Sequence, residues 1–461
     1  MMKIAQLYTP GIAQCSYVVG SGKKCAVVDP VRNIEPYLEK AKEFDMEITA
    51  ILETHLHADF ISGHMELAEK TGAPIYAPRI ANCTYEHYAL GDEEEFVLEQ
   101  LRFKLLETPG HTPDCAVYLV TDLERGEEPV LSFTGDTLLV GDVGRPDLFP
   151  SREEELAEKL FHSLGRLKEL ADHVEVYPAH GMGSLCGRAL SAKLWSTVGI
   201  ERRYNYALQH TGLDSFKRDL LTDMPAAPDH FARCSEINRR GPALLGGLPV
   251  PKPMKAAEVA SLIVEGTTVI DTRPYHSFAA AHIPGSYSIS HHGNLATFAG
   301  WIIPPEANLI LLLEREGDFE NVKSTLYNVG LDQISGYLEG TMESWINGGL
   351  PVENVETISV ERLRNWMDKE SPLVLDNRAK GEWKKEHIAG TILAPAPDIR
   401  HRYSEWDKNT PLVVLCNTSN RSMTAASILK QKGFKKVINA VGGTTAWSAA
   451  GYPMEAGGEG E

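Results

Sequence analysis

Thr54-His55-Leu56-His57-Ala58-Asp59-Phe60 is the stretch that decides the fold of this 461-residue chain. It places two imidazoles and a carboxylate directly after the apolar run 48–52, which is typical of a short buried strand. Imidazole and carboxylate groups on a loop at a strand end can converge on a metal ion. Phe60 interrupts the polar pattern, because a benzyl side chain offers no lone pair. The stretch therefore predicts a metal site with apolar surface on one side.

Three later motifs add further candidate ligands. His111 lies in Pro-Gly-His-Thr-Pro, Asp136 in Thr-Gly-Asp-Thr-Leu and His180 in Pro-Ala-His-Gly. Each motif follows a predicted strand, so loops from a sheet edge can bring these side chains to one ion. One histidine proves little, but four such motifs in one domain indicate a metal centre.

The first 245 residues alternate short apolar runs with helical patterns. Ser151 and the glutamates after it predict the N-cap and first turn of a helix that continues to about residue 170. A linker rich in Gly and Pro, residues 241–253, ends this part of the chain. Strands are predicted at residues 16–19, 25–28, 48–52, 103–106, 116–120, 130–133 and 174–177.

An internal repeat of about 100 residues follows the linker. Val-Ile-Asp-Thr-Arg at 269–273 returns as Leu-Val-Leu-Asp-Asn-Arg at 373–378, and His-Ile-Pro-Gly at 282–285 returns as His-Ile-Ala-Gly at 387–390. Each copy alternates strand and helix, which predicts two small α/β domains with parallel sheets. The predicted domains are residues 1–245, 252–355 and 356–461.

The metal motifs, in their residues and in their order along the chain, resemble those of the metallo-β-lactamase superfamily over the first 245 residues. Within that superfamily they resemble the motifs of the persulfide dioxygenases. The residues that carry the resemblance are 54–64, 135–148 and 177–181. The resemblance implies an αββα sandwich. It also implies one Fe(II) per N-terminal domain, with His55, His111 and Asp136 as ligands. Two imidazoles and one carboxylate form the facial triad of oxygen-activating non-haem iron enzymes.

The same resemblance gives the neighbouring residues a supporting part. His57, Asp59 and His180 would orient the ligands or hold water. In that superfamily an Asp-His pair serves a second metal, and Phe60 takes the place of that histidine, so a mononuclear site is expected. Arg145 is expected near the metal, either in contact with an anionic thiol carrier or paired with Asp142 or Asp147.

Residues 411–416 predict a buried strand that delivers Cys416 into the loop Cys-Asn-Thr-Ser-Asn-Arg-Ser, ahead of a helix at 423–431. Such a loop points backbone N–H groups inward at a helix N-terminus, which stabilises a thiolate or an anionic persulfide. The six-residue loop that closes on Arg421, with the repeat motifs upstream, resembles the rhodanese family. The resemblance implies that Cys416 carries sulfane sulfur beside the fixed charge of Arg421. The candidate substrate contacts in the loop are Asn417, Ser419 and Ser422.

The first copy of the repeat differs from the second at the position of the cysteine. Aligning Leu-Leu-Leu-Glu at 311–314 with Val-Val-Leu-Cys at 413–416 puts Glu314 where the nucleophile should be. A copy without a thiol cannot relay sulfur. Residues 252–355 are therefore predicted to be a catalytically silent rhodanese-like domain that spaces or docks the active one.

Charge and cysteine composition indicate which partners and which compartment to expect. A net charge of −18 without a basic stripe argues against nucleic-acid binding. Seven cysteines without a CxxC pair suit a reducing compartment, and neither a signal-peptide pattern nor a membrane-length apolar run is present. We expect a cytoplasmic protein without a membrane partner.

These observations predict a persulfide dioxygenase fused to a rhodanese. A low-molecular-weight persulfide would be oxidised with O2 to sulfite, and sulfite would accept sulfur from Cys416 to give thiosulfate. Two alternatives remain: a thioester hydrolase of the glyoxalase type, which Phe60 disfavours because such enzymes use two metals, and a sulfur carrier that serves a protein acceptor. The sequence leaves open homo-oligomer formation, the roles of Cys15 and Cys234, and the carrier, which could be glutathione, coenzyme A, bacillithiol or a protein persulfide.

Overall fold

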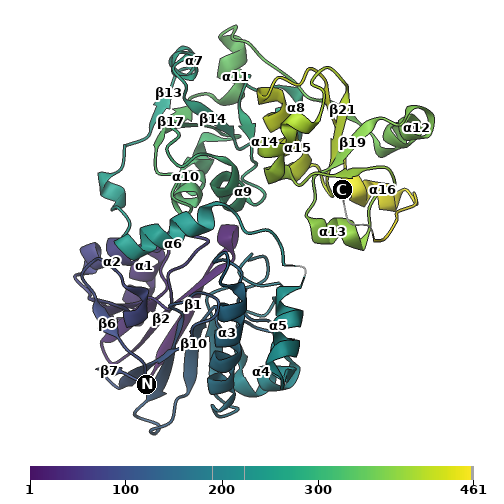
Figure 1. Ribbon diagram of the computed structural model, residues 1–461. Helices are drawn as coiled ribbons and strands as arrows, with labels where there is room; N and C mark the ends of the chain where they lie inside the picture. Colours follow the sequence, from purple (N-terminus) through teal and green to yellow (C-terminus); the bar gives the residue numbers. More distant parts are fainter. Residues whose placement is uncertain (189, 223, 458–461) are drawn as a thin grey trace. The chain divides into compact units, whose positions relative to one another are not determined.

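The computed structural model describes residues 1–188, 190–222 and 224–457. The chain forms two compact units (Figure 1). The first comprises Met1–Leu248 with Tyr327–Gly330, and the second comprises Pro249–Leu326 with Leu331–Glu461. No helix in the described ranges has both the length and the apolar character that a membrane span requires.

The N-terminal unit contains two six-stranded sheets. The first sheet has the order β1-β2-β3-β4-β5-β6, with β1 Lys3–Thr9, β2 Gln14–Ser21, β3 Lys24–Val28, β4 Glu47–Leu52, β5 Ile75–Pro78 and β6 Tyr88–Leu90. The second has the order β12-β11-β10-β9-β8-β7, with β7 Glu95–Leu98, β8 Leu101–Glu107, β9 Ala116–Asp122, β10 Leu131–Gly135, β11 Glu175–Pro178 and β12 Ser196–Thr197.

Strand β9 shows how the sheets are packed. Tyr118 and Val120 belong to the apolar core that both sheets share, whereas Val117 and Leu119 belong to the core under the helices. This alternation follows from the two-residue period of a strand. Helices lie on both outer sides of the unit, with α1 Glu35–Phe44 and α2 His64–Thr71 on one, and α3 Glu153–Lys168, α4 Val198–Tyr204 and α5 Leu213–Leu221 on the other (Figure 1). The predicted αββα sandwich is confirmed.

The predicted strands are present, but the start of α3 was predicted wrongly. The helix begins at Glu153, and its N-cap is Arg152, which makes no side-chain cap hydrogen bond. Ser151 has a φ of 67°, in the left-handed region, so it lies in the preceding turn. The glutamates Glu153, Glu154 and Glu155 occupy the first turn, where negative charge favours the helix dipole.

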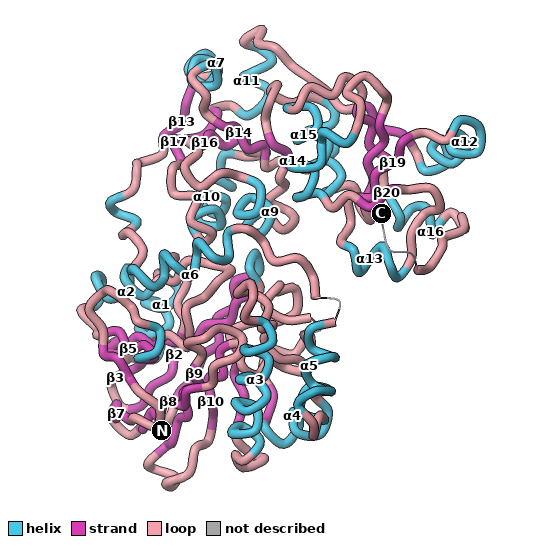
Figure 2. The backbone as a smooth tube through the Cα atoms, in the orientation of Figure 1, coloured by secondary structure: helices cyan, strands magenta, loops and turns pink. Residues whose placement is uncertain are grey.

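The second unit holds two five-stranded parallel sheets (Figure 2). The first has the order β13-β17-β16-β14-β15, with β13 Lys252–Met254, β14 Thr268–Asp271, β15 Tyr287–Ser288, β16 Leu309–Leu312 and β17 Ile334–Leu338. The second has the order β18-β22-β21-β19-β20, with β18 Glu356–Ile358, β19 Leu373–Asp376, β20 Ile392–Leu393, β21 Leu412–Leu415 and β22 Val437–Ala440. The predicted parallel sheets are confirmed.

Helices accompany each of these sheets in the same sequence positions. With the first sheet go α7 Ala256–Val264, α8 Tyr275–Ala280, α9 Leu295–Ile302, α10 Phe319–Tyr327 and α11 Thr341–Asn347. With the second go α12 Val360–Glu370, α13 Lys380–Lys385, α14 Ile399–Arg402, α15 Asn420–Gln431 and α16 Gly443–Ala449. In both copies an arginine pairs with the aspartate two residues before it, at 2.6 Å in Asp271–Arg273 and in Asp376–Arg378.

Strand pairing corrects the alignment of the two copies. β16 pairs with β14 as β21 pairs with β19, and Leu312 and Leu415 hold equivalent places in these pairs. The residue after Leu415 is Cys416, so its counterpart is Leu313 and not Glu314. Leu313 is only 1% exposed, and the first copy therefore carries a buried aliphatic side chain at the nucleophile position.

Candidate metal centre and sulfur-transfer loop

The predicted metal ligands come together at strand ends in the N-terminal unit. His55 follows β4, His111 follows β8 and Asp136 follows β10. All three side chains are buried, and one ligand atom from each lies within 4.8 Å of the others. This trio is the set that the family resemblance implied.

The donor atoms of the trio fit a cation. Nε2 of His55 and Nε2 of His111 are buried without a hydrogen-bond partner, 3.9 and 3.3 Å from Oδ2 of Asp136. Buried polar atoms are normally satisfied, so two such nitrogens beside one carboxylate indicate a metal site. Burial lowers the pKa of both imidazoles, and for His55 the neighbouring His57 lowers it further. Both shifts favour the neutral form of the ring, which metal ligation requires.

Contacts behind the imidazoles fix which nitrogen faces the site. The Thr54 hydroxyl donates to Oδ2 of Asp29 at 2.8 Å, so it accepts from Nδ1 of His55 at 3.0 Å. Nδ1 of His111 donates to the carbonyl of Arg145 at 2.8 Å. Both Nε2 atoms therefore keep a free lone pair directed toward Asp136.

His180 lies between two carboxylates. Its Nδ1 is 2.8 Å from Oδ1 of Asp136, and its Nε2 is 2.9 Å from Oδ2 of Asp59. Burial alone would lower the pKa of His180, but these carboxylates raise it well above its ordinary value. Burial alone would raise the pKa of Asp136, but His180 and the other imidazoles lower it far below the ordinary range. His180 thus keeps Asp136 ionised.

A second group of donor atoms adjoins the trio. Asp59, His180 and Cys186 each offer one atom within 4.8 Å of the others. Burial raises the pKa of Cys186 well above its ordinary value, and a protonated thiol is a poor metal ligand. The buried ring of Phe60 lies beside this group, with its centroid 4.4 Å from that of His57 and 6.4 Å from that of His180.

Asp29 is an important residue that the sequence did not single out. Its carboxylate accepts the Thr54 N–H at 2.8 Å as well as the Thr54 hydroxyl, and Oδ1 lies 3.2 Å from Nε2 of His57. The backbone of Asp29 has a φ of 49°. A single acidic residue after the apolar run 25–28 was the only available signal. His57 therefore contacts a carboxylate behind the metal loop.

Helix α6 (His230–Arg240) contacts the metal loop through Asn238. Asn238 donates to the carbonyls of His57 and Phe60, each at 2.8 Å, and accepts the N–H of Ser62 at 2.9 Å. One amide side chain thus holds the turn after the metal-binding stretch.

Arg145 has the second of the two roles that the sequence left open. The side chain is buried, and its Nε and Nη2 atoms donate to the carboxylate of Asp147 at 2.7 and 2.6 Å. Nη1 donates to the carbonyl of Leu185 at 3.2 Å. The guanidinium is thus engaged within the domain by its ion pair with Asp147.

The predicted cysteine loop lies between β21 and α15. Cys416 is buried, and its Sγ receives the N–H of Ser419 at 3.1 Å and the hydroxyl of Ser422 at 3.6 Å. Ser419 has a φ of 80°, which turns its N–H toward the sulfur. The single hydroxyl proton of Ser422 is shared between this sulfur and Oδ1 of Asn439, which lies 2.7 Å from Oγ. Backbone and hydroxyl donors therefore converge on the sulfur atom.

Arg421 braces this loop. Its Nη2 donates to Oε1 of Glu382 at 2.8 Å and to Oδ1 of Asn417 at 2.9 Å. Burial opposes the charge of Arg421, but the Glu382 carboxylate raises its pKa above the ordinary value. Glu382, on α13, was not anticipated from the sequence because it lies far from the loop along the chain.

Comparison with known proteins assigns each part of the chain. The family model described as "Metallo-beta-lactamase superfamily" matches residues 9–180, and "Rhodanese-like domain" matches residues 255–347 and 359–450. A crystal structure of a metallo-beta-lactamase from Staphylococcus aureus subsp. aureus COL is 30% identical, with a TM-score of 0.65, and the match covers 73% of this chain and 98% of that one. The chain belongs to the metallo-beta-lactamase superfamily.

Two further proteins are similar to part of this chain. A hydroxyacylglutathione hydrolase of Pseudomonas entomophila (strain L48) is 34% identical over 160 residues, which cover 35% of this chain and 58% of that protein. The chain therefore spans less than two thirds of that relative. The crystal structure of ETHE1 from Myxococcus xanthus is 26% identical, with a TM-score of 0.45, and the match covers 51% of this chain and 98% of that one. In the present chain, the metallo-beta-lactamase domain is followed by two rhodanese-like domains.

Proposed function

We propose that the protein is a persulfide dioxygenase that uses one Fe(II) per N-terminal domain and is coupled to a sulfurtransferase at Cys416. The observation that carries the proposal is the joining of the trio His55, His111 and Asp136 to a sulfur-binding cysteine loop in one chain. Two imidazoles and a carboxylate leave metal positions open for dioxygen and a sulfur ligand. Phe60 supports a single metal, because its ring adds no donor to the second group.

The proposed oxidation acts on the sulfane sulfur of a low-molecular-weight persulfide. The balanced change is RSSH + O2 + H2O → RSH + HSO3⁻ + H⁺, in which sulfur is oxidised and dioxygen is reduced. Iron, when bound, would supply the activation of dioxygen. The chain's own part is to hold the ligands: Thr54 and the Arg145 carbonyl orient the two imidazoles, and His180 keeps Asp136 ionised.

The proposed transfer uses Cys416 as a carrier. Its thiolate attacks the outer sulfur of a second persulfide, so that a Sγ–S bond forms and the RS–S bond breaks. The proton of the outer sulfur passes to the leaving RS⁻, and the thiol RSH leaves. Sulfite then attacks that sulfur, the Sγ–S bond breaks, thiosulfate leaves and the thiolate returns. The N–H of Ser419, at 3.1 Å from Sγ, would stabilise the sulfur anion in both steps.

The expected reactants are thus a persulfide, O2 and sulfite, in a reducing cytoplasm. All seven cysteines are without a disulfide, which suits that compartment.

A thioester hydrolase of the glyoxalase type is the second candidate. It is supported by the likeness to the hydroxyacylglutathione hydrolase. This candidate requires two metals per chain and thioester hydrolysis without oxygen uptake.

Analysis of the products tests whether oxidation at the metal centre and sulfur transfer at Cys416 are separate steps. Iron-loaded protein supplied with glutathione persulfide in air should yield sulfite and thiosulfate. The Cys416→Ser variant should yield sulfite with little thiosulfate, because only the carrier is lost. A Cys25→Ser variant is the control, since that thiol lies on β3 of the other unit and should leave the product ratio unchanged. Equal loss of both products in Cys416→Ser would contradict the proposal.

A further inference from the structure

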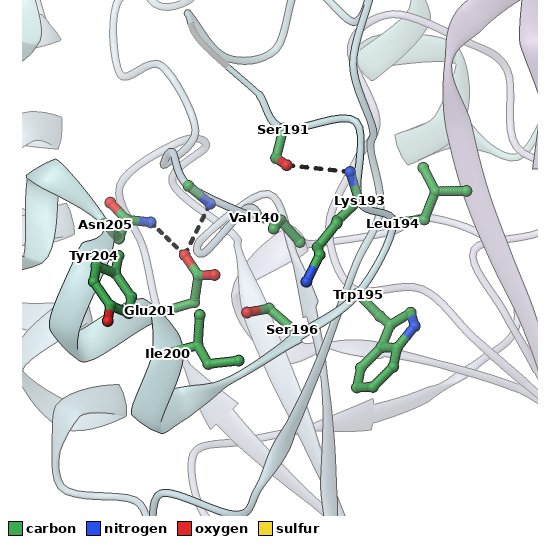
Figure 3. Close-up of a pocket in the computed structure, with 11 residues that line it drawn as sticks. Val140, Ser191, Lys193, Leu194, Trp195, Ser196, Ile200, Glu201, Tyr204 and Asn205 are labelled. Carbon is green, nitrogen blue, oxygen red and sulfur yellow. Dashed lines mark hydrogen bonds between the residues drawn. The ribbon is translucent and has the colours of Figure 1, made fainter.

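A pocket of about 330 Å³ lies beside α4 in the N-terminal unit (Figure 3). Its walls come from the turn at Val140 and Gly141, from the segment before β12, and from α4 itself. The metal trio and the second donor group contribute no side chain to its lining. The metal chemistry proposed above therefore leaves this pocket without a role.

The floor of the pocket carries a buried carboxylate. Glu201 is only 2% exposed, and its Oε2 accepts the N–H of Gly141 at 2.8 Å and the side-chain amide of Asn205 at 2.9 Å. Its other oxygen points into the pocket (Figure 3). Among the described residues no side chain forms an ion pair with Glu201. A buried negative charge without a counter-ion is costly, so this oxygen favours a cationic ligand.

An opposite charge faces the same space. Lys193 lines the pocket, and its ammonium group is directed toward the space between Glu201 and Ser196 (Figure 3). Within the described part of the chain Lys193 takes part in no salt bridge. Its side chain is exposed, and the long stem of a lysine can adopt other rotamers to meet a ligand.

The remaining wall is apolar and open to solvent. Trp195 is 50% exposed and Ile200 is 46% exposed, and both line the pocket. Exposed large apolar side chains around a cavity are typical of ligand sites. The pocket thus combines a fixed anion, a mobile cation and an apolar wall.

We propose that this pocket binds the head group of a free α-amino acid. The ammonium group would lie against Glu201, the carboxylate against Lys193, and the apolar side chain along Trp195 and Ile200. A ligand that carries both charges satisfies both pocket groups at once, which a simple amine or a simple acid cannot do.

A matched set of probes tests the proposal by isothermal titration calorimetry on the full-length protein. L-norleucine carries both charges, n-pentylamine lacks the carboxylate, and hexanoate lacks the ammonium group. L-norleucine should bind at least about tenfold more tightly than either of the others, because each charge-assisted contact contributes to affinity. Equal affinity for all three probes, or no binding of L-norleucine at millimolar concentration, would overturn the proposal.

Two variants assign each charge to its residue. Glu201→Gln should weaken L-norleucine about tenfold or more and leave hexanoate unchanged. Lys193→Met should weaken L-norleucine and hexanoate and leave n-pentylamine unchanged. Lys193 is exposed, so its variant remains informative even if Glu201→Gln fails to fold. Lys42→Met, on α1 of the same unit, is the control for net charge, and an equal loss of affinity in it would contradict a specific site.

Discussion

At position 60 a benzyl ring lies beside the second group of donor atoms. Phe60→His would place an imidazole near Asp59 and His180, whose carboxylate and ring nitrogen lie 2.9 Å apart. We expect the metal content of the zinc-loaded variant to rise from about one ion per chain toward about two, because a third strong donor completes the group. Elemental analysis after desalting measures this, and Phe60→Leu should stay near one. About two metal ions in the unaltered protein would contradict the role assigned to Phe60.

Asp29 acts on the metal centre through Thr54 and His57. Asp29→Asn removes the charge that both residues contact, and it should lower iron affinity about 10- to 100-fold, as loss of such supporting contacts does. Competition with a chelator measures the affinity. Asp45→Asn is a matched control, because Asp45 also has a left-handed backbone, with a φ of 58°, but lies at the exposed end of α1. An unchanged affinity in Asp29→Asn would contradict this role.

Among single residues, the sequence identified those that lie in short distinctive motifs. The imidazoles and Asp136 were found because each follows a strand within such a motif. Asp29 and Glu382 were not found, because one acidic residue in a long chain carries no signal until the fold brings it to its partner. The choice between carrier and ion pair for Arg145 likewise depended on where Asp147 lies.

Among the elements, the turn into α16 determines the shape of the cysteine loop. Gly443 has a φ of 50°, and a Cβ there would lie 1.8 Å from the carbonyl oxygen of Cys416. Gly443→Ala should abolish sulfur transfer to cyanide, because the loop must move. Gly433→Ala is the control: its φ is 88°, but its Cβ would meet nothing within 4 Å, so it should cost only the backbone strain of about 1–2 kcal/mol. Similar activity in both variants would contradict this account.

Helix α15 joins the two rhodanese-like copies within the second unit. The Thr424 hydroxyl donates to the carbonyl of Ser288 at 2.6 Å, and the Ser288 N–H donates to Ser427 at 3.1 Å. Ser288 lies on β15, an edge strand, so the first copy obtains partners for its edge from the helix that follows Cys416.

Removing one of these bonds should destabilise the second unit. Thr424→Val leaves the Ser288 carbonyl without this donor and should lower the free energy of unfolding by about 1 kcal/mol. Urea denaturation followed by circular dichroism measures the change. Thr325→Val is the control, because Thr325 bonds only within its own helix, to the carbonyl of Asn321. Equal loss in both variants would show that α15 has no special part in joining the copies.

Element types were predicted well from periodicity, but their ends and registers were not. The start of α3 and the counterpart of Cys416 were each misplaced by one residue. In each case a backbone torsion or a strand pairing determines the position, and the local sequence predicts neither.

For the whole molecule, the metal trio lies in the first compact unit, and the rhodanese-like repeat, apart from Tyr327–Gly330, lies in the second. Removing iron with a chelator should therefore lower the midpoint temperature of only one of the two unfolding transitions in calorimetry. A bound ion stabilises its unit by about 4 kcal/mol when its free concentration is a thousand times Kd. Cys416→Ser should leave both transitions unchanged, because it preserves side-chain size. A shift of both transitions on chelation would mean that the units unfold together.

The order of domains was predictable because the motifs and the repeat are long-range features of the sequence. The strand orders were not, because β15 and β20 are two-residue strands that no sequence pattern distinguishes from loop.

Oxygen consumption by the iron-loaded Cys416→Ser variant, on addition of glutathione persulfide, tests the central claim most directly. We expect about one O2 per persulfide, following the balanced reaction, with sulfite accumulating, and no uptake by the zinc-loaded protein. No oxygen uptake by the iron-loaded protein, together with hydrolysis of a hydroxyacylglutathione thioester by the zinc-loaded protein, would contradict the dioxygenase and favour the hydrolase.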